Sequence, residues 1–505
     1  MGKYALALDF GNGGGRAFFL DLESGHSFSA YQSWSYYSPN GDGFITEFNA
    51  SEFFNVFCNL VNGIIYQHKI SPDDVVGISV TSMRHTCVFL DKDGKEVYAG
   101  PNVDVRGLFY QDVIEENVDL DLFKLTGQWP PLLFMPARLA WFKGEEPDIF
   151  AKIKYALTAA DWLIYKLSGV KACEPSLASA TMLFDLDKKA WMYDVLESLD
   201  MDDIELPEIC NSGEAVGGLK TDIANKMGLK PGTPVVVGGS DTQLGLLACG
   251  AFDDGDLSVV AGTSTPVMLV SSKPVVGKEQ RVWTANHVLP DRWVLEGNAQ
   301  MGGLTWAWMK DNFQEITGKD GDETYRFMEG LASKVPAGSE EVFASLGSEI
   351  SNIQELSTIR PSLFMFPKPT RPMNLNPPGF GHFIRATLEN IAYAIRGNAE
   401  QLEAIVKKKS NNLRVTGGMS KSQLWLEILS SIIGKPVIAT EITEGTSVGC
   451  AICAAVGAGY YNNLKDGVKA AIKYKKEVKP NDKIIDVYNS GYNRWKEIYS
   501  KITDL

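Results

Sequence analysis

Two aspartates follow apolar stretches that we expect to be buried strands, and this placement suits them to chemistry. Asp9 lies in "YALALDFGNGGGR", residues 4–16, and Asp241 in "VVVGGSDTQLG", residues 235–245. Carboxylates at the carboxyl ends of strands lie where open α/β sheets bind their ligands. There Asp241 could accept the proton of an alcohol during phosphoryl transfer, and Asp9 could bind Mg²⁺ directly or through water. Position alone leaves open that Asp241 instead caps the helix 242–250 after a Gly-Gly turn.

The segment after Asp9 is rich in glycine, a residue whose backbone N–H groups can approach a phosphate closely. Gly11 and residues 13–15 supply these glycines. A dinucleotide-binding turn requires a further glycine at position 16 and then a helix, but Arg16 stands there and residues 17–21 read as a strand. We therefore predict the tip of a β-hairpin, which either cradles phosphate or is a plain glycine-rich turn.

A second hairpin is predicted in residues 256–272, where two apolar strands flank the Gly-Thr-Ser sequence at 262–264. The hydroxyls and backbone N–H groups of this tip could act as the first tip does, and residues 417–418 form a third glycine turn. Two tips of this kind could hold a triphosphate from opposite sides.

An Arg84-His85 pair lies between two expected strands in "TSMRHTCVFLD", residues 81–91. Such a pair is suited to hydrogen-bonding hydroxyl groups, whereas composition alone favours a surface ion pair. The other histidines are isolated, which argues against a transition-metal site. Neither a G-x-x-x-x-G-K-[ST] loop nor a serine nucleophile elbow occurs, so any phosphate transfer differs from that of a P-loop kinase.

Composition restricts the class of protein. The chain has 505 residues and a formal charge of −14, with no basic run to offset it, which argues against a nucleic-acid partner. The longest uncharged stretch, 445–464, is broken by glycines and polar residues and predicts a closely packed helix rather than a membrane span. Seven scattered cysteines, with Cys450 and Cys453 at redox-motif spacing, are typical of buried, reduced thiols. With Asp9 interrupting the only apolar N-terminal run, we expect a cytoplasmic protein without nucleic-acid or membrane partners, and we consider a homodimer as its assembly.

The elements that must position these residues repeat one plan in two halves. The first 250 residues alternate strand and helix patterns, such as a strand over 4–10 and a helix over 50–70. The second half restarts with its own hairpin, and a chain of this length exceeds one compact core. The Gly/Asp-rich segment "AFDDGD" marks a boundary between domains 1–252 and 253–505. We expect ligands to bind in a cleft between these domains.

Several stretches together resemble the FGGY family of carbohydrate kinases from end to end. They are "LALDFGNGGGRA", "SMRHTCVFLDKDG", "NVDVR", "ADWLIYKLSG", "GTPVVVGGSDTQLGLLACGA", "VVAGTSTPV", "RVTGGMSKSQLWLEILSSIIGKPV" and "EGTSVGCAICAAVGAG". The resemblance implies an α/β fold of two ribonuclease-H-like domains of the actin/hexokinase ATPase type. It also implies that these domains close on ATP and a small sugar or polyol, with a catalytic cleft between them.

The resemblance implies a role for each matching residue. Asp241 corresponds to the catalytic base, and Asp9, together with Asp241, lies near Mg²⁺. The nucleotide positions are Gly11, Asn12, Gly13 and Arg16 in the first phosphate loop, Gly262, Thr263 and Ser264 in the second, Gly303 against the nucleotide, and Gly418 and Ser422 at the adenosine. The substrate positions are Arg84, His85, Asp104 and Asp241.

The sequence departs from the family pattern in two places. Asn12 and the glycines at 13–15 replace the Thr and Ser of the usual first tip, which leaves the phosphate to backbone donors and Arg16. Arg84 resembles the arginine of glycerol and autoinducer-2 kinases, whereas His85 resembles the histidine of xylulokinases.

We predict an enzyme that uses Mg-ATP to phosphorylate a hydroxyl on a small sugar, first a ketopentose and alternatively an autoinducer-2-type substrate or another polyol. Two rival functions come from other classes. A nucleotide-gated module of the same ATPase fold would bind ATP without sugar-dependent turnover. A nicotinamide dehydrogenase would need a helix after residue 15.

Overall fold

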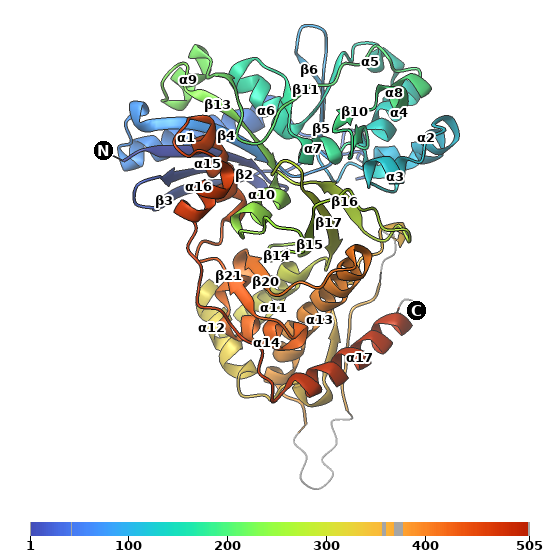
Figure 1. Ribbon diagram of the computed structural model, residues 1–505, viewed down its shortest axis with the longest axis vertical. Coiled ribbons are helices and arrows are strands. Elements are labelled where there is room, and N and C mark those ends of the chain that lie inside the picture. The colour runs from blue at the N-terminus through green and yellow to red at the C-terminus, as the bar shows by residue number, and fades with distance from the viewer. Residues whose placement is uncertain (1, 42, 356–359, 368–376, 503–505) are drawn as a thin grey trace.

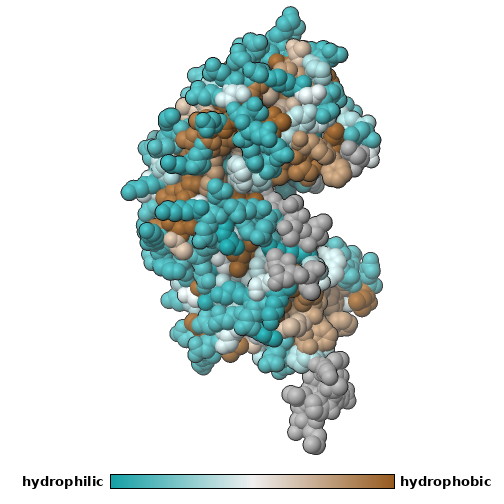
Figure 2. Space-filling view, turned by 90° about the vertical axis from the view of Figure 1, so that its right-hand side faces the viewer, coloured by the Kyte–Doolittle hydropathy of each residue, from teal (hydrophilic) through white to brown (hydrophobic). Residues whose placement is uncertain are grey.

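Two lobes stacked along the long axis make up the molecule (Figure 1). The structure is a computed structural model that describes residues 2–41, 43–355, 360–367 and 377–502. Each lobe contains a six-stranded sheet, in the order β12-β13-β4-β1-β2-β3 in the first and β16-β17-β15-β14-β20-β21 in the second. Figure 2 shows a hollow between the upper and lower parts of the molecule.

The first sheet opens with the predicted hairpin. Its strands are β1 (Tyr4–Phe10), β2 (Gly14–Asp21), β3 (Ser27–Ser33), β4 (Val75–Ser82), β12 (Ala215–Gly218) and β13 (Pro234–Ser240). β1 and β2 pair antiparallel, while β4 runs parallel to β1 and β13 runs parallel to β4. A strand therefore follows residue 15, which confirms the hairpin and contradicts the helix that a nicotinamide dehydrogenase would need.

The second sheet repeats this plan. Its strands are β14 (Leu257–Val260), β15 (Pro266–Ser271), β16 (Trp283–Asn286), β17 (Trp293–Asn298), β20 (Leu413–Thr416) and β21 (Val437–Ala439). β14 and β15 form the predicted antiparallel hairpin, and β20 runs parallel to β14 as β4 does to β1. The two glycine-containing tips thus occupy equivalent places in the two sheets.

Smaller sheets surround this frame. β5 (Cys87–Leu90), β6 (Glu96–Gly100) and β7 (Tyr155–Thr158) form a three-stranded sheet with its own hydrophobic core in the upper lobe. The two-stranded pairs are β8 (Ala172–Cys173) with β11 (Glu208–Ile209), β9 (Phe184–Asp185) with β10 (Ala190–Trp191), and β18 (Phe343–Ser345) with β19 (Leu363–Met365).

Helices cover the sheets wherever apolar residues recur at helical spacing. In α1 (Ala50–His68), Phe53, Phe57, Val61 and Ile64 are buried, and the Asn49 side chain caps the first turn. The other helices of the first half are α2 (Gln111–Asn117), α3 (Leu122–Thr126), α4 (Met135–Glu145), α5 (Pro147–Phe150), α6 (Ala159–Ser168), α7 (Pro175–Ser179), α8 (Tyr193–Ser198), α9 (Thr221–Met227) and α10 (Asp241–Ala248). Those of the second half are α11 (Gly302–Thr317), α12 (Gly321–Ala332), α13 (Phe380–Val406), α14 (Gln423–Ile433), α15 (Gly445–Gly457), α16 (Leu464–Ala471) and α17 (Ile485–Ile502). Short 3₁₀ turns are η1 (Pro72–Asp74), η2 (Arg106–Tyr110), η3 (Pro131–Leu133), η4 (Ser339–Glu341), η5 (Ile353–Glu355) and η6 (Gly418–Lys421).

One late helix belongs spatially to the first lobe. α15 follows both large sheets in the chain, yet its residues Val448 and Ile452 share a core with Ala5, Phe18 and Val236 of the first sheet. Figure 1 shows α15 and α16, in orange-red, beside the blue strands of the upper lobe. The chain therefore returns to the first sheet after the second sheet is complete.

The cysteines are buried as predicted, and the first part of the uncharged stretch 445–464 forms the packed helix α15, Gly445–Gly457. All seven cysteines are free and buried, including Cys450 and Cys453 on α15. Among the residues that the structure describes, no helix has both the length and the apolar character needed to cross a membrane.

Candidate active site

The two aspartates of the first lobe lie at the same edge of the sheet. Thr81 of β4 pairs in register with Asp9 of β1 on one side and with Gly239 of β13 on the other. Two strand spacings, about 10 Å, therefore separate the backbone of Asp9 from that of Gly239, two residues before Asp241. Ser240 is the N-cap of α10 and Asp241 is the first residue within the helix, so the capping position falls to Ser240. Both carboxylates project from the carboxyl edge of parallel strands.

The Gly-Gly turn expected before Asp241 is instead the end of a strand. Gly238 and Gly239 continue β13, with a register irregularity between Val237 and Gly239. A Cβ at Gly238 would lie 2.0 Å from the carbonyl oxygen of Val80, and one at Gly239 would lie 2.5 Å from the Val288 side chain. The glycines are needed because the neighbouring backbone and side chains pack tightly against this strand.

Burial and neighbouring charges shift the pKa values of both aspartates. Burial raises the pKa of Asp241 to about 6, with the guanidinium of Arg84 opposing the shift and the carboxylate of Asp9 adding to it. Burial also raises the pKa of Asp9, while Arg16 lowers it in part. The three charged groups that shift the pKa of Asp241 therefore come from the first hairpin (Asp9), from the segment just after β4 (Arg84) and from the second lobe (Glu296).

The first turn of α15 joins the two aspartates. The Ser447 hydroxyl donates to Asp9 Oδ2 at 3.2 Å, and the Thr446 hydroxyl donates to the carbonyl oxygen of Asp241 at 3.0 Å. Gly445 lets α15 begin close to β20, since a Cβ there would lie 2.7 Å from Thr416 Oγ1. Sequence reasoning missed both hydroxyls, although the "EGTSVG" segment shows small polar residues at a helix start.

Arg84 forms an ion pair that crosses between the lobes. Its Nη2 lies 2.6 Å from Oε1 of Glu296 on β17, and its guanidinium lies 5.7 Å from the ring centroid of Trp283. Glu296 is 3% exposed and the Arg84 side chain 10%, so the surface ion pair favoured by composition is wrong and the pair is largely buried. Sequence reasoning did not single out Glu296, whose one signal is an acidic residue within the apolar strand "WVLEGN".

His85 lies beside this pair in an aromatic setting. Its backbone has a φ of 61°, and its ring contacts those of Phe134 and Trp283 at centroid distances of 5.0 and 5.5 Å. Burial and the neighbouring charge of Arg84 lower the pKa of His85 to about 3, so the imidazole is neutral. A neutral imidazole can both donate and accept a hydrogen bond.

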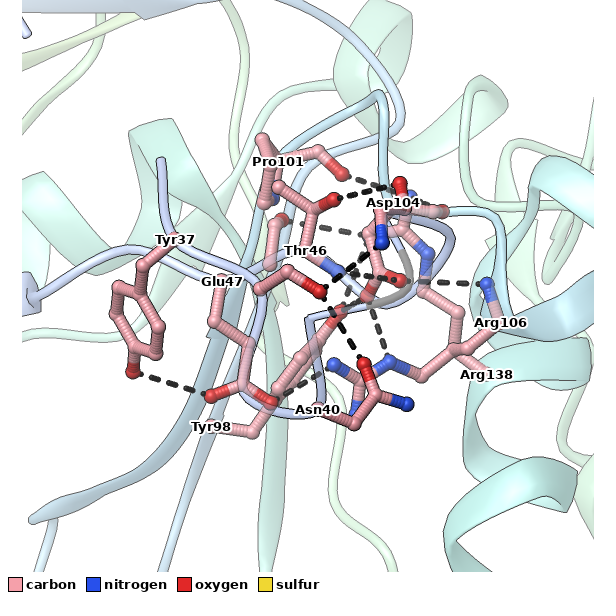
Figure 3. Close-up of polar contacts among 12 residues, drawn as sticks. Tyr37, Asn40, Thr46, Glu47, Tyr98, Pro101, Asp104, Arg106 and Arg138 are labelled. Atoms are coloured by element: carbon pink, nitrogen blue, oxygen red, sulfur yellow. Dashed lines mark hydrogen bonds and ion pairs between the residues drawn. The ribbon is translucent and has the colours of Figure 1, made fainter. Parts of the chain in front are cut away.

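Asp104 lies in a buried network of its own in the upper lobe (Figure 3). Its Oδ2 accepts from the Tyr98 hydroxyl and lies 2.7 Å from Arg106 Nε. Its Oδ1 accepts from the Thr46 backbone, and Arg138 donates to its carbonyl oxygen at 3.0 Å. The carboxylate oxygens of Asp104 are thus held by protein donors, and the residue is fully buried.

A cavity of about 570 Å³ brings together most of the predicted nucleotide residues of the second half. Its lining includes Gly262, Thr263, Gly303, Gly418 and Ser422, along with Trp306, Tyr325, Arg326 and Lys421. A Cβ at Gly303 would lie 1.9 Å from the carbonyl oxygen of Gly262, which explains why α11 opens with glycine. Ser422 caps α14 through its hydroxyl, and Ser264 is exposed outside the lining.

The cavity is connected to the aspartates by direct packing. A Cβ at Gly417 would lie 2.5 Å from the carbonyl oxygen of Ala261, and the preceding Thr416 packs on Gly445 at the start of α15. The next residue, Thr446, contacts Asp241. Residues in contact with one another therefore connect the cavity to the edge of the first sheet that carries Asp9 and Asp241.

Comparison with known proteins identifies the family of the chain. Residues 4–248 match the N-terminal domain and residues 257–458 the C-terminal domain of the FGGY family of carbohydrate kinases. The chain belongs to the FGGY family. It is therefore a kinase that transfers a phosphoryl group to a sugar acceptor, as the sequence predicted.

Whole-chain relatives agree with this assignment. The chain is 29% identical to an autoinducer-2 kinase of Photorhabdus laumondii over 510 residues, covering 99% of this chain and 94% of the relative. It is also 29% identical to an autoinducer-2 kinase of Escherichia coli K12, covering 98% and 94%.

Solved structures of FGGY-like fold match over the full length. A gluconate kinase of Lactobacillus acidophilus superposes with a TM-score of 0.85 at 18% identity, covering 100% of this chain and 99% of that one. A glycerol kinase of Plasmodium falciparum with ADP gives 0.82 at 20% identity, covering 98% of each. The predicted two-domain fold of the actin/hexokinase ATPase type is confirmed.

The first tip of this FGGY protein differs from the second in its surroundings. Asn12 and Gly13 are exposed, and the Asn12 carbonyl oxygen accepts from the Tyr36 hydroxyl at 2.5 Å and from Trp34 Nε1 at 3.2 Å. Gly11 donates within the tip to Gly14, and Arg16 Nη1 lies 3.8 Å from Glu444 just before α15. These residues lie outside the lining of the 570 Å³ cavity.

Proposed function

We propose that this FGGY kinase transfers the γ-phosphoryl group of ATP to a hydroxyl of a small sugar, with Asp241 as the general base. The proposal rests on a series of residues in contact with one another. The series begins at the 570 Å³ cavity and continues through Gly417 and Gly445 to Asp241. ATP in the cavity and a sugar beside Asp241 would then meet at one edge of the first sheet.

Asp241 suits the role of base because of its setting. Burial raises its pKa to about 6, so the carboxylate is ionised at neutral pH and yet is a stronger base than an exposed aspartate. It would orient the acceptor hydroxyl and take its proton as the phosphoryl group arrives. The backbone N–H groups of Gly262 and Thr263 would face the phosphates from the second tip.

The donor set also fits Mg²⁺. Asp9 and Asp241 offer two carboxylates at one edge, and Ser447 adds a hydroxyl on Asp9. No group of three or more His, Cys, Asp or Glu that could hold a metal occurs in the described part of the chain. Mg²⁺ usually takes one or two protein carboxylates and completes its shell with water and phosphate oxygens, so two are sufficient. When bound, the ion would neutralise charge on the transferring phosphate.

We propose a ketopentose as the first acceptor. Arg84 offers a fixed donor whose charge acts on Asp241, and the neutral imidazole of the neighbouring residue His85 offers an adaptable donor-acceptor, a combination that suits a polyhydroxy ketone. Asp104, predicted to contact the sugar, would do so only if the sugar displaced one of its protein partners.

The second candidate acceptor is the autoinducer-2 precursor. It is favoured by the names of the curated relatives, which are autoinducer-2 kinases at 28–29% identity over nearly the whole chain. His85 is the residue in which this chain departs from that branch.

A coupled assay of ADP release tests the proposal. Xylulose, gluconate, glycerol and the autoinducer-2 precursor would be offered with Mg-ATP, and we expect acceptor-dependent ADP release with at least one of them. Asp241→Ala should lower kcat by about 10²–10⁴-fold and leave ATP binding largely intact. Near-normal turnover of this variant would exclude the role of base, and ATP binding without acceptor-dependent turnover would favour the nucleotide-gated module.

A further inference from the structure

Three hydroxyl groups hold the backbone that carries Asp241, and each comes from a different element. Thr81 of β4 donates to the carbonyl oxygen of Gly239 at 2.8 Å. Thr446 of α15 donates to the carbonyl oxygen of Asp241 at 3.0 Å. Between them, the backbone N–H of Ser240 donates to Ser176 Oγ of α7 at 3.0 Å. Of these three contacts, the one with Ser176 comes from a small helix of the upper lobe, α7.

The Ser176 hydroxyl is oriented by a buried acid. It donates to Oε2 of Glu174, which also accepts from the backbone N–H groups of Ser176 at 2.7 Å and Leu177 at 3.3 Å. A serine hydroxyl has one hydrogen and two lone pairs. Because Glu174 takes the hydrogen, a lone pair of Ser176 Oγ is left for the N–H of Ser240.

The packing leaves little room for another arrangement. Glu174 is 1% exposed and Ser176 is fully buried. A Cβ at Gly239 would lie 3.3 Å from Glu174 Oε2 and 3.4 Å from Ser176 Oγ, so the strand before Asp241 rests directly on this pair. The Gly-Gly sequence of β13 therefore permits the approach of α7.

We propose that Glu174 and Ser176 are positioning residues for phosphoryl transfer: they fix the backbone at Ser240 and thereby the direction of the Asp241 carboxylate. The inference rests on the proposed role of Asp241 as base. A general base must lie within hydrogen-bond reach of the proton that it takes, and a misplacement of about 1 Å can cost about 100-fold in rate. Neither residue needs to touch ATP or the sugar.

The state of Glu174 makes a conservative variant informative. Burial raises the pKa of Glu174 to about 8, so it is a neutral acid at pH 7. Glutamine has the same shape, the same charge and a carbonyl oxygen that can accept the three hydrogen bonds of Oε2. Glu174→Gln should therefore keep the Ser176 hydroxyl oriented, whereas Glu174→Ala releases it.

The test compares four variants in the full-length protein with Mg-ATP and xylulose, or with the autoinducer-2 precursor if that is the acceptor. We expect Ser176→Ala and Glu174→Ala to lower kcat by about 10- to 100-fold without a matching rise in the KM for ATP or acceptor. Glu174→Gln should recover most of the rate that Glu174→Ala loses. Thr181→Ala is the matched control, because the Thr181 hydroxyl is also buried and bonded, but only to the backbone of Ala178 and Leu183.

The outcomes separate this inference from the proposed function. If Asp241→Ala retains turnover, the base assignment fails and the positioning role fails with it. If Asp241→Ala abolishes turnover but Ser176→Ala behaves like Thr181→Ala, only the positioning role is wrong. A Ser176→Ala protein that loses thermal stability but keeps its kcat per folded molecule would likewise overturn the inference.

Discussion

The two hairpin tips follow one plan, but glycine is required around them for different reasons. Beside the second tip, Gly303 of α11 is required because its backbone meets the Gly262 carbonyl oxygen, and this contact forms a wall of the 570 Å³ cavity. At the first tip, a Cβ at Gly14 would lie 2.4 Å from the Gln32 carbonyl oxygen, and one at Gly15 would lie 2.8 Å from the Trp34 ring. A glycine-rich stretch thus marks a close approach, and the neighbour can be the protein itself rather than a ligand.

The tips also differ in charge. Asp9 is the next-to-last residue of the strand that leads into the first tip, whereas Val260 and Ala261 lead into the second. The first tip therefore contributes a carboxylate and the second contributes backbone donors and the Thr263 hydroxyl. This division predicts that changes at the first tip affect kcat and stability, whereas changes at the second tip affect ATP binding.

The largest expected effect is that of Asp9→Asn on turnover. If Asp9 holds Mg²⁺ as proposed, loss of this carboxylate should lower kcat by more than about 100-fold, because a bound metal supplies several kcal/mol of charge stabilisation. The kinetic assay is ADP release over a range of Mg²⁺ concentrations. Unchanged kcat would show that the carboxylate of the first tip takes no part in transfer.

Asp9→Asn should stabilise the folded protein even though it lowers kcat. Burial raises the pKa of Asp9, so the folded protein holds this proton more tightly than the unfolded chain and loses stability as pH rises above the ordinary value for aspartate. In the presence of a chelator, Asp9→Asn should raise the unfolding free energy more at about pH 7.5 than at about pH 4. Denaturant unfolding at both pH values measures this, and an equal effect at both would contradict the assignment.

Gly303→Ala should weaken ATP binding by about 10- to 100-fold, since overpacking costs about 1–3 kcal/mol and 1.4 kcal/mol is tenfold in affinity. The new Cβ would meet the Gly262 carbonyl oxygen at 1.9 Å and must move the second tip. Isothermal titration with ATP gives the affinity. Gly330→Ala is the control, because nothing lies within 4 Å of a Cβ at that helical glycine.

Gly14→Ala should lower the stability of the protein and leave the KM for ATP nearly unchanged. Its Cβ would collide with Gln32 and the Tyr31 ring, which costs about 1–3 kcal/mol and lowers Tm by several degrees. We expect the KM for ATP to change by less than about twofold. A large rise in that KM with an unaltered Tm would mean that the first tip grips phosphate as tightly as the second.

The smallest effect is expected from the hydroxyl of the second tip. Thr263→Val keeps the shape and removes one hydrogen-bonding group, which is worth about 0.5–1.5 kcal/mol and thus about 2- to 10-fold in the KM for ATP. Asn12→Ala at the first tip should change the KM for ATP less. Alanine keeps the backbone carbonyl oxygen that accepts from Tyr36 and Trp34. Equal effects of the two changes would remove the distinction between the tips.

The sequence predicted those elements of the candidate site that depend on local pattern, the two hairpins, whereas the roles of their residues stay predictions. Asp9, Asp241 and both hairpin tips follow from apolar strands that end in glycine and polar residues, and these signals lie within a dozen residues. Glu296 could not be found in this way, since its partner Arg84 is 212 residues away. Thr446 and Ser447 are likewise distant from the aspartates that they contact.

Packing also explains where the local pattern misled. Gly238 and Gly239 suggested a turn, but they remain in β13 because Val80 and Val288 leave no space for a Cβ. Composition suggested that Arg84 is on the surface, but the second lobe covers it with β17. In each case the deciding neighbour comes from another part of the fold.

The return of α15 to the first sheet has a consequence for how the protein is made. Ser447 is separated from Asp9 by 438 residues, so at about 5–20 residues per second the ribosome adds it tens of seconds later. Until then the upper lobe has its strands and both aspartates but lacks the hydroxyls that join them. The edge that carries Asp9 and Asp241 is therefore among the last regions to assemble during synthesis, and a nascent chain that stops before α15 should lack kinase activity if the proposed site is the active one.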